Sequence, residues 1–255
     1  IETIQRLHDG AIGDITSMRA YWNDAGVWTR ARKDLEQAAG RPLTEMEYQM
    51  RNWYYFVWLC GDHIVEQHIH NLDVINWVKQ GHPTKAWGMG GREIRGGTDK
   101  GEIFDHHAVE FEYADGSRLS SQCRHIRGCW SAVAEHVRGT KGTSDVSANS
   151  IQGESPWRYN VPGARNPYQQ EHDDFFAAIR NDTPYNELEY GAFSSMTAIM
   201  GRLSTYSGKE ITWDEALNSK LESMPKVLGW DAAPPNMPDA KGRYPLAVPG
   251  VTVTV

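Results

Sequence analysis

Cysteine is scarce in this sequence. The three that occur, Cys60, Cys123 and Cys129, include no pair with CxxC spacing. An odd number without such a pair argues against a disulfide framework and against a cysteine-ligated zinc site. A single Cys123–Cys129 disulfide remains open, and we expect Cys60 to be buried and unreactive.

Long apolar runs and dense basic runs are also missing. No apolar stretch reaches the roughly 18 residues that span a bilayer, and no basic-then-apolar leader opens the chain. Lys and Arg number 26 against 33 Asp and Glu, which gives a formal net charge of -7. We therefore expect a soluble protein with no nucleic acid or membrane among its partners.

The composition is that of a folded chain, because 40% of its 255 residues are hydrophobic and 23% are charged. We expect one large domain at 13–233, followed by a proline-rich tail at 234–255 that runs over the surface. Residues 1–12 begin without Met and are typical of the end of a helix stopped by Gly10. We expect that an upstream segment has been removed.

The predicted elements combine a sheet with helices. Strands are expected at 14–22 and 83–91, with hairpins at Asp115–Gly116 and around Gly139–Gly142, so the sheet should be largely antiparallel. Residues 43–59 are consistent with either helix or strand. Helices are predicted at 62–79, at 166–179 with an Asn166 cap and a capping-box Gln169, at 187–206 before Gly208, and after Thr212 with a Thr212/Glu215 capping box.

The helix at 62–79 carries the chemistry. With Asp62 as its N-cap and Gly81 beyond its end, a regular helix would place four ionisable side chains within an arc of roughly 80°. These are His63, Glu66, His70 and Asp73. The opposite side is apolar, as a helix packed on a sheet requires, and consists of Ile64, Val65, Ile69, Leu72 and Ile75.

Acid–base catalysis is the functional interpretation of this face. Histidine titrates near neutral pH, and a carboxylate one turn away tunes its basicity. His70 could then take the proton from a sugar hydroxyl while hydride leaves the same carbon, a contribution of roughly 10²- to 10⁴-fold. The structural alternative is a solvated Glu66/His70 pair worth a few tenths of a kcal/mol, and spacing alone does not decide between them.

Residues 61–77, GDHIVEQHIHNLDVINW, resemble the signature helix of the Gfo/Idh/MocA oxidoreductases, in which glycine-rich residues precede D-x-x-x-H-x-x-D and an apolar tail that ends in an aromatic residue. On this match His70 stands at the catalytic histidine, Glu66 replaces the usual aspartate, and Asp73 is the following acid. The resemblance covers nearly the whole chain, including the segments at 4–15, 109–124, 136–146, 166–182 and 198–217.

The resemblance implies an α+β fold, an open, mainly antiparallel β-sheet with helices packed on one face, whose other face forms a homodimer or homotetramer. It implies a sugar or sugar-derivative substrate between this sheet and the nicotinamide of NAD or NADP. The most similar subfamily often carries twin-arginine export signals, so the protein could be cytoplasmic or periplasmic.

The dinucleotide-binding part of such an enzyme is missing from this sequence. The resemblance makes residues 1–12 the end of a linker helix from an absent N-terminal Rossmann domain. Gly88–Gly91 lacks the third glycine of a dinucleotide turn, and Gly139–Ser144 fails the P-loop spacing. No cofactor-binding or metal-binding residue is therefore expected here, and the chain alone should be inactive.

Further candidates for substrate binding were weighed against structural roles. They are His63, His68, Arg124, His125 and Tyr54, the last forming an aromatic platform with Trp53 and Tyr55. His106, His107 and His172 are expected to be surface or sheet residues.

Three other functions remain open. A metal-dependent lyase or hydrolase would use His63, Glu66, His70 and perhaps His68, but His63 and His70 lie about 10 Å apart along a regular helix. The other two are an NAD-assisted glycosidase and a non-catalytic module for sugar binding or oligomerisation.

Overall fold

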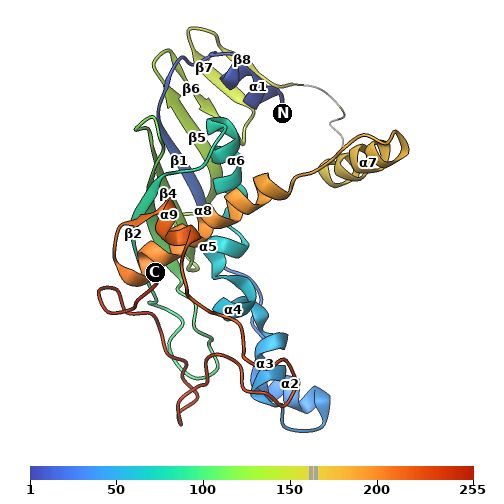
Figure 1. The fold of residues 1–255 in the computed structure, drawn as a ribbon, viewed down its shortest axis with the longest axis vertical. Coiled ribbons are helices and arrows are strands. Elements are labelled where there is room, and N and C mark those ends of the chain that lie inside the picture. The colour runs from blue at the N-terminus through green and yellow to red at the C-terminus, as the bar shows by residue number, and fades with distance from the viewer. Residues whose placement is uncertain (161–162, 164–165) are drawn as a thin grey trace.

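The computed structural model describes residues 1–160, 163 and 166–255, and these form one mixed sheet covered by helices (Figure 1). Among the described residues the sheet has nine strands, in the order β8-β7-β6-β5-β1-β4-β3-β2-β9. Their bounds are β1 (Ile15–Asp24), β2 (Lys85–Gly91), β3 (His106–Glu112), β4 (Arg118–His125), β5 (Ala132–Gly139), β6 (Gly142–Asp145), β7 (Ser150–Gly153), β8 (Trp157–Arg158) and β9 (Ile211–Thr212).

Neighbouring strands pair antiparallel except β1 and β4, which run parallel with Asp24 opposite His125. The predicted α+β class and mainly antiparallel open sheet are confirmed. Both predicted hairpins form, β3–β4 around Asp115–Gly116 and β5–β6 at Gly139–Gly142.

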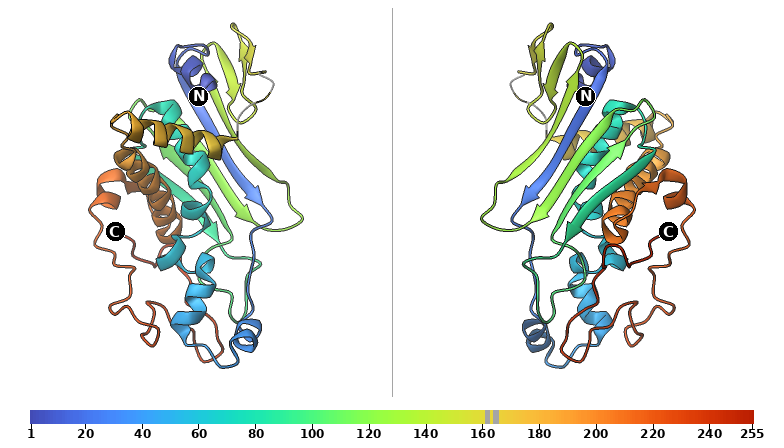
Figure 2. Two further views of the ribbon diagram at one scale, coloured as in Figure 1. Left: turned by 90° about the vertical axis from the view of Figure 1, so that its right-hand side faces the viewer. Right: turned by 90° about the vertical axis from the view of Figure 1, so that its left-hand side faces the viewer.

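The helices at 69–79 and 188–207 cover one face of the sheet, while those at 32–39 and 45–51 lie beyond its end (Figure 2). Side chains alternate along β4, where Leu119, Ser121 and Cys123 are buried beneath the helices while Ser120 and Gln122 face outward. The helical elements are α1 (Glu2–His8), α2 (Arg32–Ala39), α3 (Glu45–Arg51), η1 (Trp53–Tyr55), α4 (Val57–Cys60), α5 (His63–Glu66), α6 (Ile69–Lys79), α7 (Pro167–Arg180), α8 (Leu188–Ser207) and α9 (Trp213–Leu217). None of these, within the described residues, is both long and apolar enough to cross a membrane.

The predicted single helix over 62–79 is wrong. It is divided into α5 and α6, and the chain between them turns at Gln67 and His68. The break follows from tertiary contacts of these two side chains. His68 is buried against Ser121 of β4, and Gln67 is bound by His125 and Tyr54. The four ionisable residues consequently do not share one helical face.

Some of the other local predictions are confirmed and others are wrong. Asn166 caps α7 through the Tyr168 N–H, but Gln169 bonds to Asp173 and forms no capping box. The Thr212/Glu215 capping box and the left-handed Gly208 after α8 are both present. Residues 43–59 are helical, as α3, η1 and α4. All three cysteines are free, and because Cys123 is buried while Cys129 is exposed, the possible disulfide between them does not form.

The C-terminal tail packs on a second hydrophobic cluster, separate from the core under the sheet. Its buried members are Tyr48, Tyr54, Tyr55, Phe56, Cys60, Ile103 and Tyr244. Tyr244 packs edge-on against Phe56, with 5.0 Å between ring centroids, and Asn236 donates to the Glu102 carboxylate. Glu102 also accepts from the Val57 N–H at 2.7 Å, and burial raises the pKa of this carboxyl to about 7. The tail therefore fixes α4 and the loop after β2 in place.

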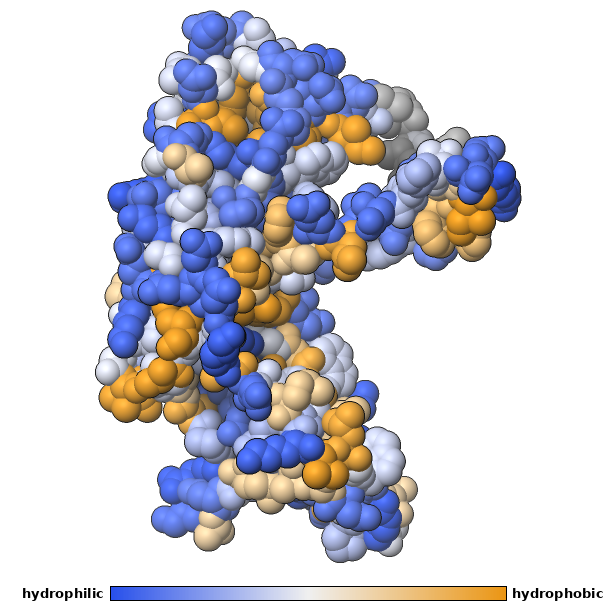
Figure 3. All heavy atoms as spheres, viewed as in Figure 1, coloured by the Kyte–Doolittle hydropathy of each residue, from blue (hydrophilic) through white to orange (hydrophobic). Residues whose placement is uncertain are grey.

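Helix α7 projects from the body of the protein and buries only Ala178 (Figure 1). Phe175, Phe176 and Ile179 are 45–58% exposed, and apolar surface gathers at its tip (Figure 3). A helix with this much exposed apolar surface is typical of an interaction site.

Helix α8 packs closely on the sheet because Gly201 has no side chain. A Cβ there would lie 2.9 Å from Phe111 Cζ and 3.0 Å from Ile64 Cδ1, and both side chains are fully buried. Glycine costs about 1 kcal/mol relative to alanine within a helix, so close packing outweighs helix propensity at this position.

We expect Gly201→Val to lower the free energy of unfolding by about 1–3 kcal/mol, because the added methyl groups overpack this contact. Urea denaturation measures the change. Gly191→Ala in the same helix is the matched control, since a Cβ there meets nothing within 4 Å, and it should stabilise by up to about 1 kcal/mol. Equal stability of the Gly201→Val variant and the native chain would contradict close packing at Gly201.

Candidate active site

The C-terminal ends of β1 and β4 and the start of β3 lie side by side at one end of the central strands. The parallel register brings Asp24 beside His125, and the antiparallel register of β3 places His107 beside Cys123. Helix α5 begins over these strand ends, so residues from three strands and one helix meet there.

Asp62 is the buried anchor of this junction. It has φ 77° and ψ 160°, a region that residues with a side chain rarely adopt. Its Oδ1 accepts from the His63 N–H at 2.5 Å, and its Oδ2 accepts from the Phe104 N–H at 3.0 Å and the Tyr206 hydroxyl at 2.5 Å. Burial raises the pKa of Asp62, but His107 and these donors outweigh it and hold the pKa below its usual value.

Three histidine rings pack side by side next to Asp62. The His63 ring lies 4.2 Å from the His125 ring and 4.9 Å from the His107 ring, between centroids. Burial lowers the pKa of His63 well below its usual value and that of His125 to about 4. His63 and His125 are therefore neutral at physiological pH. His107 was expected to be a surface or sheet residue; it lies on β3, and its side chain is buried in this cluster.

Tyr54 and His125, predicted to bind substrate, and Glu66, predicted to act in catalysis, come together around Gln67, which was not among the predicted site residues. His125 Nε2 donates to Gln67 Oε1 at 2.8 Å, and the Tyr54 hydroxyl donates to the same oxygen at 3.3 Å. Burial, and then the Glu66 carboxylate, raise the pKa of Tyr54. Trp28, also missed, contacts Trp53, Tyr54 and Tyr55 edge-on, and Trp28 and Trp53 are 38% and 36% exposed.

His70 lies apart from this group, on the exposed side of α6. Its ring is 5.9 Å from that of Trp22 on β1, and it has no side-chain hydrogen bond to any described residue. Trp22 is on the face of β1 that the helices cover, two residues from buried Ala20. The imidazole is thus accessible next to a half-buried indole.

The remaining candidates lie elsewhere. Asp73 Oδ1 accepts from the Ser194 hydroxyl at 2.6 Å, which turns Asp73 toward α8. Arg124 follows the outward-facing residues of β4, on the sheet face opposite His125, and donates to the Trp130 carbonyl. His68 lies fully buried beneath α6. The lyase or hydrolase site of the sequence analysis is not assembled, because His63 and His68 are buried and His70 is exposed.

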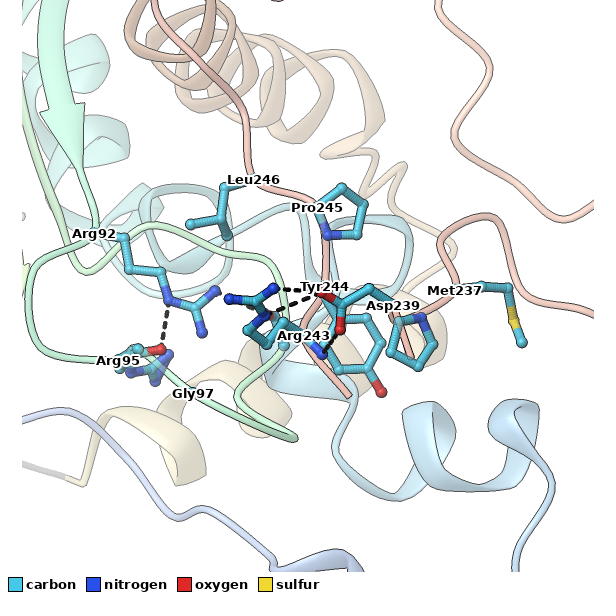
Figure 4. Close-up of a pocket in the computed structure, with 12 residues that line it drawn as sticks. Arg92, Arg95, Gly97, Met237, Asp239, Arg243, Tyr244, Pro245 and Leu246 are labelled. Atoms are coloured by element: carbon cyan, nitrogen blue, oxygen red, sulfur yellow. Dashed lines mark hydrogen bonds and ion pairs between the residues drawn. The ribbon is translucent and has the colours of Figure 1, made fainter. Parts of the chain in front are cut away.

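Two cavities flank this region. One of about 580 Å³ lies between the loop after β2 and the C-terminal tail, with Arg92, Arg95 and Arg243 in its wall (Figure 4). Arg92 bonds backbone carbonyls and Arg243 pairs with Asp239, so neither guanidinium is free for a ligand. The other, of about 570 Å³, lies between the end of α6 and the start of α8 and includes Trp77 and Tyr190. His70 lines neither cavity.

No family model matches the sequence, and no curated protein matches it. Solved structures share its fold. An oxidoreductase from Thermotoga maritima aligns with a TM-score of 0.61 and 16% identity over 84% of this chain and 59% of that one. The aldose-aldose oxidoreductase from Caulobacter crescentus, complexed with glycerol, aligns with a TM-score of 0.62 and 13% identity over 83% of this chain and 59% of that one.

A levoglucosan dehydrogenase in complex with NADH and levoglucosan gives a TM-score of 0.59 and 16% identity, over 82% of this chain and 61% of that one. At such identities the likeness establishes the fold alone. The chain spans about three fifths of the length of these oxidoreductases.

His68 makes stability depend on pH. Its Nδ1 donates to Asn71 Oδ1 at 3.1 Å, its Nε2 accepts from the Ser121 hydroxyl at 2.7 Å, and burial lowers its pKa to about 3. Between pH 6.5 and 3 the unfolded chain binds a proton at His68 that the folded protein excludes. The stability from His68 is fully present above pH 6.5 and is lost as the pH falls toward 3.

We therefore expect the free energy of unfolding to fall by about 2 kcal/mol more between pH 7 and 5 in the native chain than in His68→Gln, at about 1.4 kcal/mol per pH unit. Urea denaturation at several pH values measures this difference, with His172→Gln on the surface as the control. Parallel pH profiles for the native chain and His68→Gln would show that His68 does not exclude the proton.

Proposed function

We propose that this chain is the substrate-binding part of an NAD- or NADP-dependent oxidoreductase that acts on a secondary alcohol of a sugar or sugar derivative. His70 takes the hydroxyl proton. The nicotinamide, bound mainly by a domain outside this sequence, accepts the hydride. The observation that carries this proposal is the accessible His70 imidazole beside Trp22, in a fold shared with sugar oxidoreductases.

The surroundings of His70 suit a sugar. Its ring nitrogens make no bond to a described side chain, so one of them is available to a substrate hydroxyl. The flat face of Trp22 offers apolar contact to a sugar ring. A general base needs only hydrogen-bond reach of the proton it removes, and an exposed imidazole meets this requirement once a substrate and a second domain cover it.

Other residues of the region receive distinct roles in this proposal. Glu66, four residues before His70 in the sequence, stands next to Tyr54 and places a carboxylate there. Tyr54, His125, His63 and His68 are each at most 2% exposed, so they support the site from beneath and do not touch substrate. Asp73 acts through α6, because its bond to Ser194 anchors that helix to α8.

A second domain also fits the exposed apolar face of α7. Phe175, Phe176 and Ile179 are left uncovered by the described chain, and a docked domain would bury them. The oxidoreductase chains that share the fold are longer than this one, which leaves room for such a domain. We expect the coding sequence ahead of Ile1 to encode a strand–turn–helix with G-x-G-x-x-G. The absence of this motif would contradict the proposed oxidoreductase function.

His70→Ala is expected to lower kcat/KM about 10²- to 10⁴-fold in the polypeptide that includes the upstream domain, because the proton acceptor is lost. NAD⁺ and NADP⁺ reduction with a panel of sugars measures turnover. His172→Ala on α7 is the control. The melting temperature of His70→Ala should stay near that of the native protein, since helices accept alanine well. Retained turnover would contradict the role of His70, and glycoside cleavage without net reduction would instead indicate an NAD-assisted glycosidase.

Glu66→Gln is expected to cause a smaller loss of kcat, accompanied by a shift of the pH–rate profile, because it removes a carboxylate from the proposed site without shortening the side chain. Steady-state kinetics from pH 5 to 9 measure both effects. A lower kcat with an unchanged profile would identify Glu66 as purely structural.

A further inference from the structure

Three buried side chains converge at the start of α5. Asp62, His63 and His107 are each at most 2% exposed, and one ligand atom from each lies within 4.8 Å of the other two. Asp62 and His63 come from the start of α5, and His107 from β3. They lie on the inner side of the His125 ring, away from the exposed His70.

The hydrogen bonds of His107 determine which nitrogen faces Asp62. His107 Nδ1 lies 2.9 Å from Thr205 Oγ1, and the Thr205 hydroxyl can donate its hydrogen to the Arg202 carbonyl at 3.0 Å and accept from Nδ1. In that arrangement the lone pair of Nε2 faces Asp62 Oδ1 at 3.3 Å, and Nε2 has no hydrogen-bond partner among the described residues. Two acceptors at this distance repel each other unless a cation or a proton lies between them.

His63 adds a second unsatisfied ligand to the same place. Neither of its ring nitrogens has a hydrogen-bond partner among the described residues, although the side chain is buried. Its Nε2 lies 3.9 Å from Asp62 Oδ1. A buried polar group left unpaired costs about 1–3 kcal/mol, so its position here requires a compensating partner.

We propose that Asp62 Oδ1, His63 Nε2 and His107 Nε2 bind one divalent transition-metal ion, with zinc as the first candidate. Zinc holds nitrogen and oxygen ligands at roughly 2.0–2.2 Å, which separates tetrahedral ligand atoms by about 3.3–3.6 Å. The Asp62–His107 distance of 3.3 Å matches this range, and the His63–Asp62 distance of 3.9 Å is slightly longer.

The surrounding bonds resemble the outer shell of a metal site. Thr205 holds the non-ligating nitrogen of His107, and the Phe104 N–H and Tyr206 hydroxyl hold the second oxygen of Asp62. Such bonds orient metal ligands and fix the histidine tautomer.

The local charges favour a transition metal over Ca²⁺ or Mg²⁺. Asp62 is the single carboxylate of the trio, whereas hard cations prefer several oxygen ligands. Two guanidinium groups are close: Arg202 donates to the Gly61 carbonyl at 3.1 Å, and the charge of Arg95 acts on His63. Binding must therefore come from directed bonds to imidazole nitrogen, which suit zinc and its neighbours.

The ion would tie α5 to β3 beneath α8, in a closed site that is filled as the chain folds. This role is structural and does not depend on the proposed oxidoreductase activity. Metal content and protein stability therefore test the metal site, and a loss of turnover by itself does not.

The experiment is metal analysis of the purified 255-residue chain, before and after chelation and after addition of zinc. We expect one equivalent of zinc, and a melting temperature about 5–10 °C higher at a free zinc concentration about 100-fold above Kd. His63→Gln and His107→Gln should each lose the equivalent and the shift. The matched control is His106→Gln, which alters the neighbouring histidine of β3, 43% exposed and bound to Asp105.

Cobalt provides a test that does not depend on the folding of any variant. Co²⁺ added to the chelated native chain should give the visible absorption of a tetrahedral site, and zinc should displace it. Absence of bound metal and of any shift with added zinc or cobalt would overturn the proposal. Equal zinc binding by the native chain and by His107→Gln, or an octahedral cobalt spectrum, would do the same.

Discussion

The structure depends on the burial of one carboxylate. Asp62 sits fully buried, in a backbone conformation that is strained for any residue with a side chain. It persists because donors from three separate segments converge on its oxygens: the start of α5, Phe104 before β3 and Tyr206 of α8. The junction of sheet edge and helix layer is thereby fixed, and α5 and α6 take their positions from it.

The break between α5 and α6 decides which ionisable residues meet. A regular helix would have aligned His63, Glu66, His70 and Asp73, but the turn at Gln67 and His68 separates them. His63 joins a buried cluster, and His70 stays accessible beside Trp22. The same segment thus supplies a candidate catalytic base on its surface and candidate metal ligands in its interior.

These two sites share a segment but differ in chemistry. The surface site has an accessible imidazole beside the half-buried Trp22 indole, which suits a substrate held against a second domain. The interior site has buried imidazoles with unpaired ring nitrogens next to one buried carboxylate. The buried cluster is linked by contact to Tyr54, since His125 stacks on His63 and shares the Gln67 side-chain oxygen with the Tyr54 hydroxyl.

The sequence by itself determined the features that arise from neighbouring residues. The Asp115–Gly116 hairpin, the Asn166 cap, the Thr212/Glu215 capping box and the Gly208 stop depend on residues a few positions apart, and all four are present. Only the tertiary structure decided the break at His68, whose partner Ser121 lies 53 residues away, and the place of His107 beside Asp62. Local propensity favours a continuous helix over 62–79. The burial of His68 and its pairing with Ser121 on a distant strand outweigh the few helical hydrogen bonds lost at the break.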